Sequence, residues 1–194
     1  MQRNSIRLRD FDYTTQGAYF VTICSHQREC IFGEILEQTM HPNLFGNIIL
    51  EEWQRTAQLR QNVLLDEFIL MPNHLHAIIH LTNEPPPSTP TVGARRASPN
   101  ITNPHKSVQK ELAISKGQLH STRSGVVSGS LGAVIGGFKS AVTKRINQSR
   151  GTQGFPVWQR DFWEHIIRND AELERIQTYI TNNPTQWLFD EEFA

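Results

Sequence analysis

The sequence predicts an α/β (α+β) sandwich: an antiparallel sheet with two helices on one face and a C-terminal helix near the other. Patterns of strand period and helix period follow one another along the chain as two βαβ-like halves. One expected strand, His74–Leu81, is apolar on one side and carries histidines on the other. Together these observations indicate a ferredoxin-like sandwich.

Size and composition fit one domain over residues 1–194. The chain has 194 residues, 38% of them hydrophobic, zero formal net charge and a pI of about 7.1. The net charge therefore does not predict nucleic-acid binding. An anion-binding surface would need positive residues to be gathered in one region. We find no signal peptide and no apolar run of the ~20 residues that span a membrane, so we expect a cytoplasmic protein with no membrane partner.

The first half of the chain predicts a strand, a short second strand and a helix. Gly17–Cys24 is rich in aromatic and β-branched residues, which favour strands. Cys30–Ile35 is expected to be its hairpin partner, with a bulge at Gly33. Asn43–Arg60 has apolar residues at helical spacing.

A tight hairpin follows, because Pro72–Asn73 separates the apolar segment Leu64–Met71 from His74–Leu81. Strand alternation divides the second of these segments between two faces of the sheet. Leu75, Ala77, Ile79 and Leu81 share one face, and His74, His76, Ile78 and His80 share the other.

Composition changes between about residues 82 and 129. This stretch is rich in Pro, Ser, Thr and Asn, carries more Lys and Arg than acidic residues, and has no aromatic residue. Such a segment buries too little surface to offset its ordering entropy. We expect a flexible basic insertion, either an arm that tracks DNA or a solvated linker.

The second half predicts a helix, a strand and a last helix. Ser130 is a suitable N-cap for a helix with apolar residues at Leu131 to Ile146. Phe155–Ile167 reads as an aromatic strand, and Asn169 with Glu172 forms a capping box. Pro184 is expected to end the last helix.

His74 and His76 are the candidate metal ligands. Their imidazoles leave one face of a strand side by side and could hold one divalent cation if a third ligand arrives from elsewhere. Tyr179 and Asn183 lie one turn apart on the last helix and could both approach that cation. Two imidazoles and an amide oxygen suit Mg²⁺ or Mn²⁺, and Tyr179 could then attack a phosphodiester.

Three motifs in order resemble the single-tyrosine HUH transposases, and most closely the REP-associated tyrosine transposases of bacteria. They are MPNHLHAII, which contains His74 and His76, then FWEHIIRN, and then YITNNP, which starts at Tyr179. The resemblance implies metal-dependent nicking and rejoining of single-stranded DNA next to hairpins, and thus DNA transposition and recombination. It also implies a 5′-phosphotyrosine on Tyr179, a free 3′-OH, and a metal held by His74, His76 and Asn183.

The expected partner is single-stranded DNA with hairpins. The expected location is the bacterial cytoplasm, in association with the nucleoid. Trp158 and Trp163 could stack on unpaired bases. The sequence leaves open whether one chain or a homodimer completes the site. The residues expected to contact DNA are Lys139, Lys144, Arg145, Arg160, His165 and Arg168.

Two other functions remain open from the sequence. The chain could be a catalytically retired regulator that binds hairpin DNA, which would need neither metal nor Tyr179. It could also be a metal-dependent phosphodiesterase in which water attacks, which would give cleavage without a covalent adduct.

Overall fold

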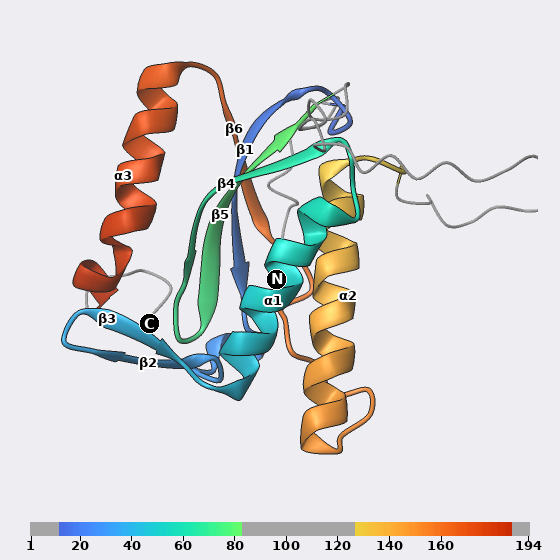
Figure 1. The fold of residues 1–194 in the computed structure, drawn as a ribbon, viewed down its shortest axis with the longest axis vertical. Coiled ribbons are helices and arrows are strands. Elements are labelled where there is room, and N and C mark those ends of the chain that lie inside the picture. Colours follow the sequence, from blue (N-terminus) through green and yellow to red (C-terminus); the bar gives the residue numbers. More distant parts are fainter. Residues whose placement is uncertain (1–11, 83–126, 188–194) are drawn as a thin grey trace, which may run out of the picture. The chain divides into compact units, whose positions relative to one another are not determined.

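The computed structural model describes residues 12–82 and 127–187, which contain a four-stranded antiparallel sheet in the order β4-β5-β1-β6 (Figure 1). The predicted α+β sandwich is confirmed. Most of the predicted insertion at 82–129 lies outside the described residues. The elements are β1 Gly17–Cys24, a 3₁₀ turn His26–Arg28, β2 Gly33–Leu36, β3 Thr39–Pro42, α1 Leu44–Gln58, β4 Val63–Leu70, β5 His74–Leu81, α2 Leu131–Arg150, β6 Trp163–Ile167 and α3 Asp170–Gln186.

The two faces of the sheet are covered by different helices. Figure 1 shows α1 and α2 together on one side of the sheet and α3 alone on the other. The β5 residues Leu75, Ala77, Ile79 and Leu81 belong to the large core with α1 and α2. A smaller apolar cluster lies under α3 and contains Phe20, Ile78, Ile167, Ile176 and Ile180. The predicted placement of the last helix is therefore confirmed.

The helices begin where their capping residues predict. Asn43 Oδ1 accepts hydrogen bonds from the first turn of α1, and Ser130 Oγ accepts one from Ala133 N. Asn169 Oδ1 accepts from Glu172 N at 2.9 Å, while Glu172 Oε2 accepts from Arg168 N. These bonds satisfy backbone donors that have no partner within a helix. The predicted capping box forms with one change, since Glu172 accepts from Arg168 N rather than from Asn169 N, and the two bonds fix the start of the helix that carries Tyr179.

Two strand predictions were wrong. The segment around Gly33 pairs with β3 as a separate hairpin, because both edges of β1 are already occupied by β5 and β6. In Phe155–Ile167, only the last five residues form a strand, β6. Trp158 makes a single β-bridge to Ser25 and buries its ring in the core. The aromatic residue is therefore there for core packing and does not mark a strand.

Pro184 does not end the last helix, since α3 continues to Gln186. A proline near a helix C-terminus removes only one intrahelical hydrogen bond. The neighbouring side chains Asn183 and Trp187 are buried, and the Trp187 ring stacks on His74 with 6.0 Å between centroids. Packing on the sheet thus holds the last turn in place.

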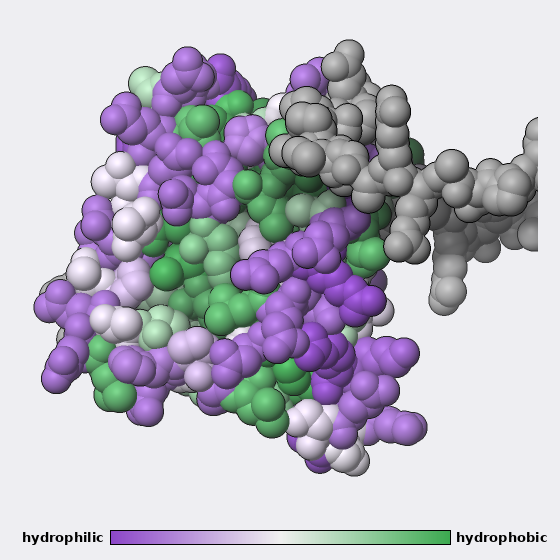
Figure 2. Space-filling model, viewed as in Figure 1, coloured by the Kyte–Doolittle hydropathy of each residue, from purple (hydrophilic) through white to green (hydrophobic). Residues whose placement is uncertain are grey.

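Hydrophilic side chains cover the outer surfaces of α1 and α3, and apolar residues show along the sheet between them (Figure 2). Among the described helices, none combines the length and apolar character needed to cross a membrane.

Candidate functional site

Two of the three histidines of β5, His74 and His76, are buried on the α3 face of the sheet. His74 is 0% exposed and His76 is 3% exposed. Their Nε2 atoms lie 3.1 Å apart. The Nδ1 atom of His74 is 2.7 Å from Asn73 Oδ1, and that of His76 is 2.8 Å from Thr22 Oγ1. The two Nδ1 atoms are thus held by hydrogen-bond partners, and the two Nε2 atoms face each other.

His74 is neutral at neutral pH. Burial lowers the pKa of His74 to about 3, and the positive charge of Arg28 acts in the same direction. An amide oxygen only accepts hydrogen bonds, so His74 Nδ1 donates to Asn73 and Nε2 keeps its lone pair. A neutral imidazole with its outer nitrogen bonded is the form that binds a cation.

Tyr179 reaches this pair from α3. Its hydroxyl lies 3.3 Å from His76 Nε2 although the two residues are 103 positions apart. The ring packs edge-on against Phe20, with 6.1 Å between centroids and 90° between planes. At 40% exposure, Tyr179 is open to solvent. The structure therefore brings the predicted nucleophile to the predicted metal ligands.

Asn183 lies one turn beyond Tyr179 and is 1% exposed, on the side of α3 that packs on the sheet with Ile176 and Ile180. Within the described ranges, no three His, Cys, Asp or Glu side chains form a metal-binding group. Among the described residues, a third protein ligand would therefore be a side chain of another type, such as this amide.

The residues present fit a divalent cation. Two ligand atoms at right angles, each about 2.1 Å from an ion, are about 3 Å apart, close to the observed Nε2 separation. Nitrogen with amide oxygen is a donor set compatible with Mg²⁺ or Mn²⁺.

A hydrogen-bonded group on the same face ties α3 to the sheet. Gln177 Nε2 donates to both carboxylate oxygens of Asp66, at 3.0 and 3.1 Å. His80 Nε2 lies 2.9 Å from Asp66 Oδ2. Burial alone would raise the pKa of Asp66, but hydrogen bonds from His80, Gln177 and the Glu67 amide outweigh it and lower the pKa. Because Gln177 is two residues before Tyr179, this group helps to fix the position of Tyr179.

The residues predicted to contact DNA are spread over both faces. Lys139, Lys144 and Arg145 lie on α2, across the sheet from the histidines. Lys139 Nζ donates to the Gln159 and Arg160 carbonyls at 2.7 and 3.0 Å, and burial lowers its pKa. Arg145 bonds Glu51 and Glu52 of α1. Both side chains therefore have a structural role.

The other predicted contacts lie in β6 and in the residues just before and after it. His165 Nε2 is 2.8 Å from Glu172 Oε1 at the start of α3. Arg160 and Arg168 are exposed. Trp163 is 38% exposed, whereas Trp158 is 6% exposed, so only the first of the two tryptophans presents its ring to solvent.

Asn73 and Thr22 are site residues that sequence reasoning missed. Asn73 was interpreted only as part of a turn, although it directly precedes His74. Thr22 pairs with His76 in the register between β1 and β5. That register is set by tertiary pairing, so no local signal could have identified Thr22, whereas the position of Asn73 beside a candidate ligand could have.

No family model matches the sequence. The chain is 33% identical over 189 residues to an uncharacterized protein of Haemophilus influenzae, and the match covers 97% of this chain and 92% of the relative.

One solved structure, a REP-associated tyrosine transposase bound to a REP hairpin, is similar at a TM-score of 0.51 and 15% identity. The match covers 97% of this chain and 77% of that chain. A second solved structure, from Deinococcus radiodurans, has a TM-score of 0.40 at 11% identity and covers 94% of this chain and 97% of that chain. Only the first of these similarities is close enough to show a common fold.

Proposed function

The chain belongs to the same family as the Haemophilus influenzae protein and has the fold of a REP-associated tyrosine transposase, and from this premise we propose that it nicks and transfers single-stranded DNA next to hairpins. Tyr179 is the proposed nucleophile. His74, His76 and Asn183 are the proposed ligands of a divalent cation, Mg²⁺ or Mn²⁺.

One observation carries this proposal: His76 Nε2 lies 3.1 Å from His74 Nε2 and 3.3 Å from the Tyr179 hydroxyl. Burying two imidazoles costs free energy. Their burial is therefore better explained by a role in function than by a contribution to stability. A half-exposed phenol beside them can meet a phosphodiester that arrives from solvent.

In the proposed step, Tyr179 Oη forms a bond to phosphorus while the bond from phosphorus to the 3′ oxygen breaks. The phenol loses a proton and the 3′ oxygen gains one, so no water and no nucleotide cofactor is consumed. The products are a 5′-phosphotyrosine and a free 3′-OH. Reversal by another 3′-OH would rejoin a strand.

The side chains around the phenol hold the reacting groups in place. Phe20 packs against Tyr179 and His76, and the bond from Gln177 to Asp66 orients α3. When bound, the cation would polarise the phosphorus and stabilise charge on the leaving oxygen.

A denaturing gel tests the proposal. The full chain is incubated with a pool of single-stranded hairpin oligonucleotides, with Mn²⁺ or with EDTA, beside Tyr179→Phe. We expect an SDS-resistant adduct that needs Mn²⁺, carries a 3′ label but no 5′ label, and is lost in the variant. Tyr13→Phe removes the same atom from a ring that packs on the α1 and α2 side, and it should form the adduct normally.

Two other outcomes would each replace the proposal with a different function. Cleavage without an adduct would identify water as the nucleophile. A shift on a native gel without cleavage, unaffected by EDTA or by Tyr179→Phe, would identify a binding protein.

A further inference from the structure

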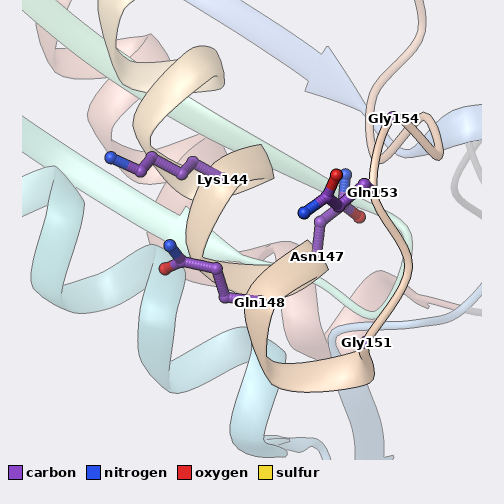
Figure 3. Close-up of a pocket in the computed structure, with 6 residues that line it drawn as sticks. All are labelled: Lys144, Asn147, Gln148, Gly151, Gln153 and Gly154. Carbon is purple, nitrogen blue, oxygen red and sulfur yellow. The ribbon is translucent and has the colours of Figure 1, made fainter.

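Two adjoining hollows, of about 520 and 480 Å³, lie between α2 and the segment that follows it. Both are lined by Lys144, Asn147 and Gly154, and Figure 3 shows the first of them. We call them together the α2 groove. It lies beside the helix that covers the sheet face opposite to the histidines, so it is separate from the candidate site.

The described residues that line the α2 groove include cations but no carboxylate. Lys144 and Arg160 are exposed lining residues, and neither forms an ion pair within the described part of the chain. Arg145, one residue away on α2, instead bonds two carboxylates. No Asp or Glu is among the described residues that line either hollow. The groove therefore favours an anionic ligand.

The uncharged lining is of the kind that contacts a sugar–phosphate backbone. Hydroxyl and amide side chains, together with Lys and Arg, make most protein contacts to phosphate and sugar. In Figure 3, Lys144 and Gln148 extend in the same direction from neighbouring turns of α2, and Gln153 faces Asn147 from the following segment. The uncharged polar side chains that line the groove are Ser140, Thr143, Asn147, Gln148, Gln153 and Gln159.

The wall of the groove is fixed by hydrogen bonds. Asn147 Nδ2 donates to the Phe155 carbonyl at 3.0 Å, and Arg150 donates to Asn147 Oδ1. The Arg150 guanidinium also lies over the Phe155 ring, 4.6 Å from its centroid. A wall held in this way needs little ordering on binding, which favours affinity.

The same segment connects the groove to the candidate site. Three residues after Arg160, Trp163 begins β6, the edge strand, and pairs with Thr22 beside His76. Phe20 packs against both Trp163 and Tyr179. DNA held at Tyr179 can therefore pass the edge of β6 and reach Lys144 and Arg160.

We infer that the α2 groove binds the phosphate backbone of the hairpin that adjoins the reacting phosphodiester in the DNA. Lys144 and Arg160 are its main contacts. This inference rests on the proposed function, because it takes the same DNA as ligand. It adds a second contact surface across the sheet from the nucleophile.

Fluorescence anisotropy in EDTA, where no cleavage is expected, measures this binding separately from chemistry. Labelled hairpin oligonucleotides are titrated with the full chain and with Lys144→Ala/Arg160→Ala at several salt concentrations. The slope of log K against log salt is negative, and each lost phosphate contact should reduce its magnitude by about 0.9, so we expect a reduction of about 2 and roughly tenfold weaker binding.

Arg55→Ala/Arg175→Ala is the matched control, because both arginines are exposed but pair with glutamates away from the groove. This control should keep the wild-type slope, and the conservative pair Lys144→Arg/Arg160→Lys should restore it. A wild-type slope in the alanine variant, or no binding by the wild type, would overturn the inference.

The inference and the proposed function can fail separately. If Tyr179 forms adducts while the groove variant binds like the wild type, the inference is wrong and the function stands. If no adduct forms while the groove variant still loses salt dependence, the function is wrong and the groove remains a DNA-binding surface.

Discussion

On β5, the side chains that face α1 and α2 are apolar, whereas the alternate side chains, which face α3, include three histidines, two of them buried. Leu75 and His76 are neighbours with 0% and 3% exposure, yet one packs among hydrocarbon and the other bonds Thr22. Burial of apolar surface stabilises the fold, while burial of an imidazole is tolerated only if its nitrogens find partners. The first face thus contributes most of the apolar core, whereas the second combines a smaller apolar cluster with the candidate site.

The largest effect should come from His76→Ala, which removes a proposed ligand and the contact with Tyr179. We expect adduct formation to fall by about 10³-fold, more than the 10–100-fold typical of residues behind a metal ligand. Because the buried ring also packs on Phe20 and bonds Thr22, the variant should lose some stability, so adduct formation is compared under conditions where urea unfolding shows it to be folded. Full adduct formation by a folded His76→Ala variant would remove His76 from the mechanism.

Leu75→Ala tests the other face of the same strand. Removal of a fully buried leucine should lower the free energy of unfolding by about 3 kcal/mol, from lost burial and the cavity left behind. Urea denaturation measures this loss. Adduct formation at low temperature, where the variant is folded, should stay near wild type; its loss there would show that the two faces do not act independently.

The buried His74 should make the α3 face sensitive to acid. Its pKa is about 3 in the folded chain and about 6.5 when unfolded, so between these values the unfolded chain binds more protons and stability falls as pH falls. At pH 5, wild type should lose about 2 kcal/mol relative to pH 8 through this group. Urea unfolding in EDTA measures the loss, and His74→Gln should lack that part of it.

The sequence was sufficient for most of the fold because period and capping are local signals. The alternation on β5 and the N-caps at Ser130 and Asn169 were predicted and are confirmed, and the structure adds a cap at Asn43. The errors came from tertiary competition. The edges of β1 are occupied by β5 and β6, which leaves β2 to pair with β3, and burial of Asn183 and Trp187 carries α3 past Pro184.

The candidate site was predictable only in part. His74, His76, Tyr179 and Asn183 could be selected by motif, and the structure adds that Tyr179 reaches His76. Thr22 and Asp66 could not be found, because they act through strand register and through a contact with α3. The sequence also could not tell which cations form ion pairs. Lys144 and Arg145 are adjacent, but only Arg145 pairs with carboxylates.

Asp66→Ala should have a moderate effect, confined to the α3 face. It removes the acceptor for Gln177 and His80, so α3 and Tyr179 should become less well positioned. We expect about tenfold slower adduct formation at saturating DNA and a stability loss of about 1 kcal/mol. The neighbouring Glu67→Ala, which changes an exposed side chain, is the control. Equal rates in the two variants would show that Asp66 does not position Tyr179.

The smallest effect should come from Trp163→Ala and should separate the two DNA contacts. Its exposed ring, parallel to His165 at 6.0 Å, is placed to stack on an unpaired base near Tyr179, an interaction worth about 1 kcal/mol or more. Anisotropy should show about fivefold weaker binding of a hairpin with a single-stranded tail and no change for a hairpin without one. Trp163→Phe should retain most of the affinity, and Leu59→Ala, an exposed apolar change next to α1, should have no effect.

Variants of the α2 groove should weaken the binding of both hairpins, with and without a tail, by the same factor, because a phosphate contact does not depend on an unpaired base. If Trp163→Ala also weakened both equally, stacking at this residue would be excluded. The α3 face would then contribute chemistry but no recognition of single strands, and binding would depend on the α2 groove.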